Sequence, residues 1–371
     1  MTLHPAGILT FILPFFITVT ALLVLRRIAE HIDLLDRPCE RKQHEGLVPL
    51  VGGIAMFCGF AVSALVLQPT WTSLALVLIA GVVLVMGILD DMHGLQTRKR
   101  FLVQILAAVA MVYIGQVQIT HLGNLFGDGE VHLGGFFALI FTVFSTVGVI
   151  NAMNMVDGAD GLAGSLALVS FAALSVIAIS AGAGSIGIYS LILVGALTAF
   201  LLFNVRIAGR RARVFMGDAG SMMLGLLMAW LFIDLSQGEQ PPLSAVSAGW
   251  IFGLPLLDIS AVMVRRLFEG RSPFEAGRDH LHHLLIDQGF SVNSALAIMC
   301  FAHIVFVSVG LLANQVPGAE PLLFWAFVIL VAAHLVLTPR LLQTRQRQHV
   351  RVLKKSLATN PVSETGGKPR D

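Results

Sequence analysis

The sequence carries little charge for its length. Asp, Glu, Lys and Arg make up 12% of 371 residues, whereas hydrophobic residues make up 56% and the mean hydropathy is +0.83. Soluble domains carry about 25% charged residues. Only three cysteines are present, so no disulfide framework is indicated. The composition therefore excludes an ordinary soluble domain and predicts an integral membrane protein.

Long apolar stretches recur along almost the whole chain. Each is long enough to cross the roughly 30 Å hydrocarbon layer as a helix, and no alternating pattern of a membrane barrel is present. We predict an all-α, polytopic membrane protein of about eleven transmembrane helices. They lie near residues 7–25, 50–69, 72–89, 101–118, 134–154, 163–182, 185–204, 220–236, 244–264, 294–315 and 321–338. The first stretch lacks a basic leading region and an Ala-x-Ala site, so we expect a span, not a signal peptide.

Positive charge is missing from every second loop. All 24 Lys and Arg residues fall in four alternate loops and in the tail after Leu337. Because basic loops stay in the cytoplasm, this predicts a periplasmic N-terminus and a cytoplasmic C-terminus. We expect a membrane domain at 1–338 and a basic, partly disordered tail at 339–371. The net charge of +2 favours contact with anionic lipid in the bilayer and gives no reason to expect nucleic acid.

Four polar motifs fall in the loops predicted to be cytoplasmic, which is where we expect the active site. They are GILDDMHGLQTRKR at 87–100, NAMNMVDGADGLAG at 151–164, RVFMGDAGS at 213–221 and RRLFEGRSPFEAGRDHLHHLL at 265–285. Carboxylates and Asn carbonyls suit Mg²⁺ or Mn²⁺ better than zinc. GDAGS precedes an apolar span, so amides at that helix start are predicted to face a phosphate. Together the motifs predict a metal-bound diphosphate at the membrane surface.

Each motif alone has a plainer interpretation. In the first motif, Asp90 and Asp91 could mark the water-facing end of a span. In the second, Asn151 and Asn154 could form hydrogen bonds between helices, and DGADG could be a glycine-rich turn.

The third and fourth motifs are open to the same treatment. Asp218 or Ser221 could cap a helix. The three loop histidines could belong to a solvated loop or a zinc site, and Arg265 and Arg266 could be topology anchors. The gathering of all four motifs on one side nevertheless favours a functional site.

In this combination and order the motifs resemble those of the polyprenyl-phosphate N-acetylhexosamine-1-phosphate transferases, over roughly residues 33–288. The resemblance implies transfer of GlcNAc-1-phosphate from UDP-GlcNAc to undecaprenyl phosphate, giving undecaprenyl-diphospho-GlcNAc and UMP at the bacterial inner membrane. This reaction would begin a cell-envelope glycan such as O-antigen or a common antigen. The SPF...HLHH loop looks like the GlcNAc-type branch. Another UDP-N-acetylhexosamine is the alternative donor. A second copy of the chain, which would give a homodimer, is a further expected partner.

The resemblance also implies roles for individual residues. It makes Asp218 the ligand of Mg²⁺ or Mn²⁺. The residues it implies as catalytic are Asp90, Asp91, Asp157 and Asp160. Those it implies as substrate-binding are Asn154, Asn204, Arg265, Arg278, His280, His282, His283, Arg98 and Lys99. The family commonly has Lys where Arg98 stands here, and a guanidinium does not replace an ammonium contact for contact.

We expect in-line attack by the lipid phosphate on the sugar-bearing phosphorus, with UMP leaving. A phosphate monoester is already mostly dianionic at neutral pH, so an aspartate base is not required. The main rival is a secondary transporter, whose signature is ionisable residues near the bilayer midplane and broken helices. Asp234 and Asp258 lie within or at the ends of predicted spans, not at their middle, and no repeat is evident. A non-catalytic scaffold is a third interpretation.

Overall fold

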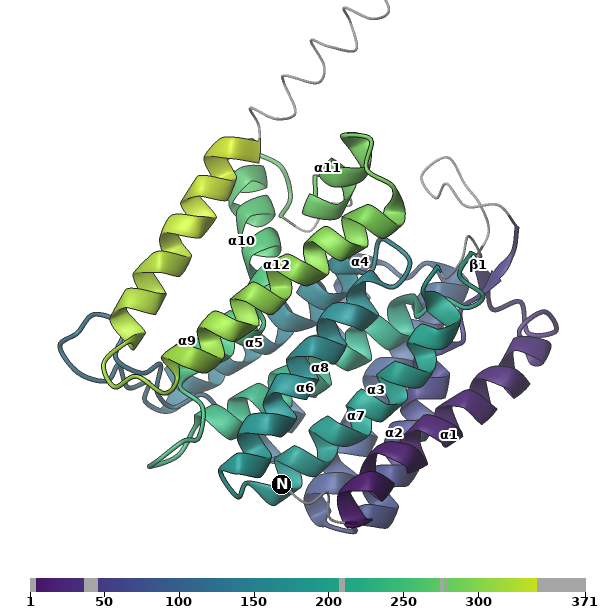
Figure 1. Ribbon diagram of the computed structural model, residues 1–371, viewed down its shortest axis with the longest axis horizontal. Helices are drawn as coiled ribbons and strands as arrows, with labels where there is room; N and C mark the ends of the chain where they lie inside the picture. The colour runs from purple at the N-terminus through teal and green to yellow at the C-terminus, as the bar shows by residue number, and fades with distance from the viewer. Residues whose placement is uncertain (1–4, 37–45, 207–210, 274–276, 278, 339–371) are drawn as a thin grey trace, which may run out of the picture.

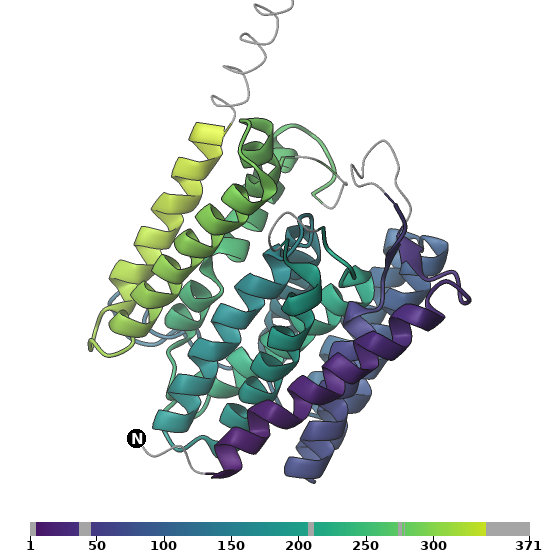
Figure 2. The same cartoon turned by 45° about the vertical axis from the view of Figure 1, so that its right-hand side comes forward.

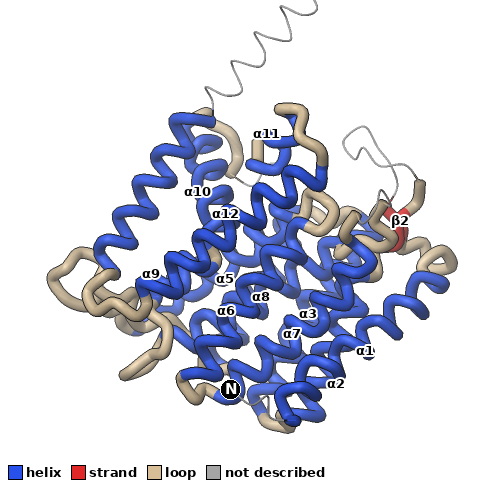
Figure 3. The backbone as a smooth tube through the Cα atoms, viewed as in Figure 1, coloured by secondary structure: helices blue, strands red, loops and turns tan. Residues whose placement is uncertain are grey.

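The computed structural model describes residues 5–36, 46–206, 211–273, 277 and 279–338. The fold is all-α, as predicted. Its helices are α1 (Pro5–Ile28), α2 (Gly52–Leu67), α3 (Trp71–His93), α4 (Thr97–Tyr113), α5 (Gly135–Val156), α6 (Leu162–Ser180), α7 (Gly184–Asn204), α8 (Gly217–Ser236), α9 (Ala245–Ile251), α10 (Gly253–Phe268), α11 (Leu281–Asp287) and α12 (Val292–Ala313). One further helix, Glu320–Thr338, is unlabelled and yellow in Figure 1. The short strands β1 (Leu35–Asp36) and β2 (Val48–Pro49) pair antiparallel (Figure 3).

Every apolar stretch predicted to span the membrane is helical. Eight helices in the described part of the chain are long and apolar enough to cross a bilayer, and the bent pair α9 and α10 brings the number to nine. Helices α2 and α4 have 16 and 17 residues, fewer than the roughly 20 that a span needs. The chain is thus a multi-pass membrane protein. The eleven spans, the orientation of the termini and the tail at 339–371, which lies outside the described residues, stay predictions.

The stretch predicted as one span at 244–264 is broken. Helices α9 and α10 meet at 87° around Phe252. Pro255 lies in the first turn of α10, where its missing N–H costs no helical hydrogen bond. A Cβ on Gly253 would lie 2.4 Å from the Phe306 ring, so α12 packs directly on the break. The hydropathy pattern could not show this bend because both pieces are apolar.

Helix α8 forms the centre of the bundle. Nearly all of its residues are buried, and α3 and α5 pack along it, with α2, α6, α7 and α9 also in contact. The approach to α3 is close enough to require glycine, since a Cβ on Gly87 would lie 2.3 Å from Ala219 Cα. Helices α1, α12 and Glu320–Thr338 lie at the periphery and expose apolar side chains (Figures 1 and 2).

The polar motifs lie toward one end of the bundle. Helix α11 and the end of α10 lie on the same side as the β1–β2 hairpin, opposite the start of α1 (Figures 1 and 2). The end of α3, the end of α5 and the start of α8 meet there through side-chain contacts. The predicted gathering of the motifs on one side is therefore present in the structure.

Candidate functional site

Asp218 lies in the first turn of α8 and has a partly open carboxylate. Its Oδ1 accepts a hydrogen bond from Asn154 Nδ2 at 2.8 Å, and the same amide lies 3.0 Å from Ser221 Oγ. Arg100 Nη1 lies 3.6 Å from Oδ2. The side chain keeps 37% exposure, although its neighbours are mostly buried. Asp218 is not the helix cap, because Met216 occupies that position. Its carboxylate can therefore face a ligand.

Asp91 binds the start of α8 with its own carboxylate. Oδ1 accepts from Asp218 N at 2.9 Å and Oδ2 from Ala219 N at 3.2 Å. A carboxylate at a helix N-terminus is stabilised by the unpaired amides and the helix dipole. The prediction that these amides face a phosphate is thus wrong, because they donate to Asp91. A Cβ on Gly217 would lie 2.5 Å from Asp91 Oδ2, and Gly217 has a φ of +72°, so both features favour glycine there.

Asp90 is buried and fully engaged. Its Oδ1 accepts from Leu95 N at 2.7 Å and its Oδ2 from Arg100 Nη1 at 2.8 Å, with 6% of the residue exposed. The plain interpretation of Asp90 as a water-facing helix end is wrong. Arg98 and Lys99 are exposed. Arg100 is instead the cation that contacts two carboxylates, and neither the motif nor the resemblance had singled it out.

The acidic turn DGADG follows the end of α5. The helix stops at Val156 with Asp157 as its C-cap, so Asp160 does not continue the helical face of Asn151 and Asn154. Asp160 Oδ2 accepts from Arg206 Nε at 2.5 Å. Asn151 is buried and donates to Gln104 Oε1 at 2.8 Å, as the helix-to-helix interpretation expects.

Asn204 ties this turn to the segment that leads into α8. Its Oδ1 accepts from Gly161 N at 2.8 Å, and its Nδ2 donates to Val214 O at 2.9 Å. The side chain is buried and both ends of the amide meet backbone atoms. The contacts describe a residue that positions two site loops, and its substrate-binding role stays a prediction.

The histidine loop packs against the acidic turn. His280 and His282 are 4% and 1% exposed, so the interpretation as a solvated loop is wrong for them. A Cβ on Gly158 would lie 2.2 Å from His282 Nε2, which places this ring directly on the turn between Asp157 and Asp160. The His282 and His283 ring centroids are 4.1 Å apart. The structure thus unites the second and fourth motifs.

Arg265 and Arg266 are buried, and their interpretation as topology anchors stays a prediction. Arg266 holds Asp279 through Nε at 3.1 Å and Nη2 at 2.6 Å, and Arg265 Nη2 lies 3.1 Å from Asp279 Oδ2. Although burial raises the pKa of Asp279, hydrogen bonds from Arg266 and Arg265 hold this pKa at about 2. Arg278, predicted to bind substrate, lies outside the described residues.

Asp258 is a second residue that the sequence motifs left out of the site. It lies in α10, is 1% exposed, and its Oδ2 is 2.8 Å from His280 Nδ1. The signal was available, since an acid inside a membrane span is expensive and is usually paired.

The donor set fits a hard cation that a substrate helps to bind. Mg²⁺ is commonly held by one or two carboxylates together with phosphate oxygens and water. Asp218 offers such a carboxylate, while the ones on Asp90 and Asp91 already accept two hydrogen bonds each. Over the ranges that the structure describes, no three His, Cys, Asp or Glu residues are arranged to hold a metal by themselves. The zinc interpretation of the histidine loop therefore finds no support there.

Comparisons with known proteins relate the chain to a family of transferases. Residues 71–236 match the model of glycosyl transferase family 4, a range that includes the first three motifs and ends before the histidine loop. The chain is similar to the undecaprenyl-phosphate alpha-N-acetylglucosaminyl 1-phosphate transferase of Escherichia coli strain K12, with 38% identity over 303 residues, 81% of this chain and 82% of the relative. The enzyme of the same name from Haemophilus influenzae is 37% identical over 314 residues, 83% and 87% of the two chains. That from Yersinia pestis is 36% identical over 302 residues, 81% and 82%.

Proposed function

This chain belongs to glycosyl transferase family 4, and from that premise we propose that it transfers GlcNAc-1-phosphate from UDP-GlcNAc to undecaprenyl phosphate, releasing UMP. The relatives are named undecaprenyl-phosphate alpha-N-acetylglucosaminyl 1-phosphate transferases, and they match most of the chain. The observation that carries the proposal is the partly open Asp218, supported by Asn154, Arg100 and Asp91 at one end of a membrane bundle. The proposed location is the bacterial inner membrane, with the site facing the cytoplasm.

Asp218 is the residue proposed to hold Mg²⁺ or Mn²⁺, and the bound cation would neutralise charge on the diphosphate. The residues around Asp218 hold its carboxylate in position. Asp91 fixes the first turn of α8, Asn154 orients Oδ1, and Asp90 holds Arg100 beside Oδ2. Because these groups are placed before substrate arrives, little reorganisation accompanies the reaction.

The proposed reaction is in-line attack by the lipid phosphate oxygen on the sugar-bearing phosphorus, with UMP leaving. The acceptor needs no base at neutral pH, since its second pKa is about 6. Asp90 and Asp91 each accept two hydrogen bonds, which favours a positioning role over proton removal. Catalysis then rests on alignment and charge compensation.

The donor is proposed to bind beside the acidic turn and the histidine loop, which pack together where His282 contacts Gly158. His280, His282, His283 and Arg278 would hold the sugar nucleotide. Use of another UDP-N-acetylhexosamine, a role in O-antigen or common-antigen assembly and a homodimer remain predictions of the same proposal.

The test is an assay of the purified full chain with undecaprenyl phosphate, UDP-GlcNAc and Mg²⁺, following UMP and the lipid-linked product. UDP-GalNAc, UDP-MurNAc-pentapeptide and EDTA are parallel conditions. We expect turnover with UDP-GlcNAc that EDTA abolishes. Asp218→Asn should abolish it in folded protein, and Asp128→Asn, a matched change at an exposed loop residue, should not. Turnover by Asp218→Asn at the wild-type rate would refute the metal assignment.

A further inference from the structure

Asp258 is a carboxylate buried in a helix whose neighbouring turns are apolar. It lies in the second turn of α10, just beyond the break after α9, and 1% of it is exposed. Burying an ionised group is unfavourable unless partners compensate for the lost hydration. The contacts that surround Asp258 are therefore the place to look for its role.

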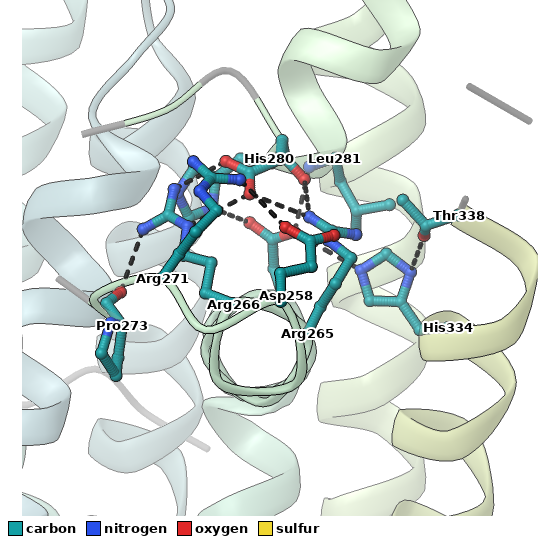
Figure 4. Close-up of polar contacts among 11 residues, drawn as sticks. Asp258, Arg265, Arg266, Arg271, Pro273, His280, Leu281, His334 and Thr338 are labelled. Carbon is teal, nitrogen blue, oxygen red and sulfur yellow. Dashed lines mark hydrogen bonds and ion pairs between the residues drawn. The ribbon is translucent and has the colours of Figure 1, made fainter. Parts of the chain in front are cut away.

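Two hydrogen-bond donors and one more distant histidine nitrogen surround this carboxylate, as Figure 4 shows. His280 Nδ1 lies 2.8 Å from Oδ2, and Leu281 N donates to Oδ1 at 3.0 Å. His334 Nε2 lies 3.6 Å from Oδ1. Because an ionised carboxylate only accepts, the hydrogen of the short contact belongs to His280 Nδ1. Nε2 of His280 is then the ring nitrogen that takes no part in the contact with Asp258.

His334 brings the last described helix into the cluster. It belongs to Glu320–Thr338, and its Nδ1 lies 2.8 Å from Thr338 Oγ1. If the Thr338 hydroxyl donates to Nδ1, Nε2 carries the hydrogen that faces Asp258. Helix Glu320–Thr338 thus brings His334 close to the same carboxylate that contacts the loop histidine.

The residue before His280 is held by the same helix. Asp279 forms a two-pronged pair with Arg266, whose Nη1 also donates to Pro273 O at 3.0 Å. Asp258 and Arg265 are seven positions apart in α10 and so lie on nearly one face. Two consecutive loop residues are therefore fixed to one rigid element, on which a functional group is held more accurately than on a free loop.

The anchored ring is linked to the rest of the site. The His280 and His282 rings are stacked with centroids 6.0 Å apart and planes 10° apart. His282 in turn lies against Gly158 in the acidic turn. The orientation of the His280 ring therefore affects the position of the His282 ring against the acidic turn.

We propose that Asp258 is a positioning residue that fixes His280 as the Nδ1–H form, with Nε2 directed to the sugar nucleotide, and that His334 holds Asp258 in place. The inference rests on the proposed function, since it assigns a part of the donor side of that site. It adds a role for two residues, in α10 and in Glu320–Thr338, that lie outside the range matched by the family model.

The first test is Asp258→Asn in the full-length enzyme. The substituted amide has one acceptor oxygen where two donors, His280 Nδ1 and Leu281 N, meet the carboxylate, and its NH₂ favours the opposite His280 tautomer. We expect kcat/KM for UDP-GlcNAc to fall about 10- to 100-fold, the usual effect of losing a partner that orients a histidine. KM for undecaprenyl phosphate should stay within about twofold of wild type. An equal weakening of KM for UDP-GlcNAc and for undecaprenyl phosphate would instead show a general structural defect and overturn the proposal, as would unchanged kinetics.

Asp234→Asn is the matched control. Asp234 is likewise a carboxylate within a membrane helix, and it lies sixteen residues along α8 from Asp218, about 24 Å away by helical rise. We expect kinetics close to wild type. A second pair tests His334. His334→Gln retains an N–H group and should keep most activity. His334→Leu lacks an N–H group and should reproduce the loss of kcat/KM for UDP-GlcNAc. Equal activity of His334→Gln and His334→Leu would refute the role of His334.

A spectroscopic measurement on the wild-type protein tests the proposal even if Asp258→Asn does not fold. Solid-state ¹⁵N spectra of histidine-labelled protein should contain a histidine with hydrogen on Nδ1, and His280→Gln should remove that signal. A His280 signal with hydrogen on Nε2 alone would overturn the proposal. Absence of turnover in wild type would refute the proposed function, and the spectrum would still decide the His280 form.

Discussion

Gly158→Ala is expected to damage the donor side of the site without unfolding the protein. The added Cβ would lie 2.2 Å from His282 Nε2, against an ordinary contact of at least 3.4 Å. Gly158 does not have a positive φ, so alanine adds bulk without backbone strain. His282 is 1% exposed and its ring is stacked on that of His280, so the ring must move by about 1.2 Å to restore an ordinary contact. A misplacement of about 1 Å near a reacting group costs on the order of 10²-fold in rate, which is about 2.7 kcal/mol.

The assay is UMP release at varied UDP-GlcNAc, with Gly148→Ala as the control. Gly148 lies in α5, has no positive φ and has no atom within 4 Å of its added Cβ, so its variant should match wild type. If the damage passes through His282, adding Gly158→Ala to His282→Ala should cost little more than His282→Ala alone. Wild-type kcat/KM in Gly158→Ala, or full additivity of the two changes, would refute the reasoning.

Three further predictions concern single contacts. Arg100→Gln should lower kcat about 10²-fold by removing the cation beside Asp90 and Asp218, whereas Arg27→Gln, at an exposed arginine, should not; equal rates of UMP release would contradict this. Asn204→Ala leaves two backbone groups unpaired and should destabilise the fold by about 2–4 kcal/mol in denaturant titrations, with exposed Asn293→Ala near neutral; similar midpoints would refute it. Asp279 has a pKa lowered to about 2 in the folded protein, so its ionised form stabilises the fold above its unfolded pKa of about 3.9, and this stabilisation is lost as the pH falls toward 2. The difference in Tm between wild type and Asp279→Asn should therefore be constant from pH 6 to 9 and shrink below pH 4. A difference that persisted at pH 2 would contradict this assignment.

The membrane fold was predictable because its signal is local. A span needs only apolar residues in sufficient number, and every predicted stretch is helical. The break between α9 and α10 was not predictable, because it depends on α12 packing against Gly253. Hydropathy indicates whether a segment lies in lipid or in water, and it gives no information about the direction of the helix axis.

The members of the site were more predictable than their roles. The motifs identified Asp90, Asp91 and Asp218, but spacing alone could not show that Asp91 occupies the amides at the start of α8. Arg100 stood in a basic triplet, and only the register of α4 distinguishes it from its exposed neighbours. Asp258 lay outside the motifs that carried the resemblance, so its contact with His280 emerges from tertiary structure alone.

Helix α8 meets protein on nearly every side, whereas Glu320–Thr338 is mostly exposed to the bilayer. A change in bilayer thickness is absorbed by the tilt of lipid-facing helices. The position of Asp218 is therefore expected to depend little on bilayer thickness, but His334 lies on one of the helices that would tilt. Membrane composition is then expected to change the affinity for the nucleotide sugar through the His334–Asp258 contact, while the contacts among Asp90, Asp91 and Asp218 stay unchanged.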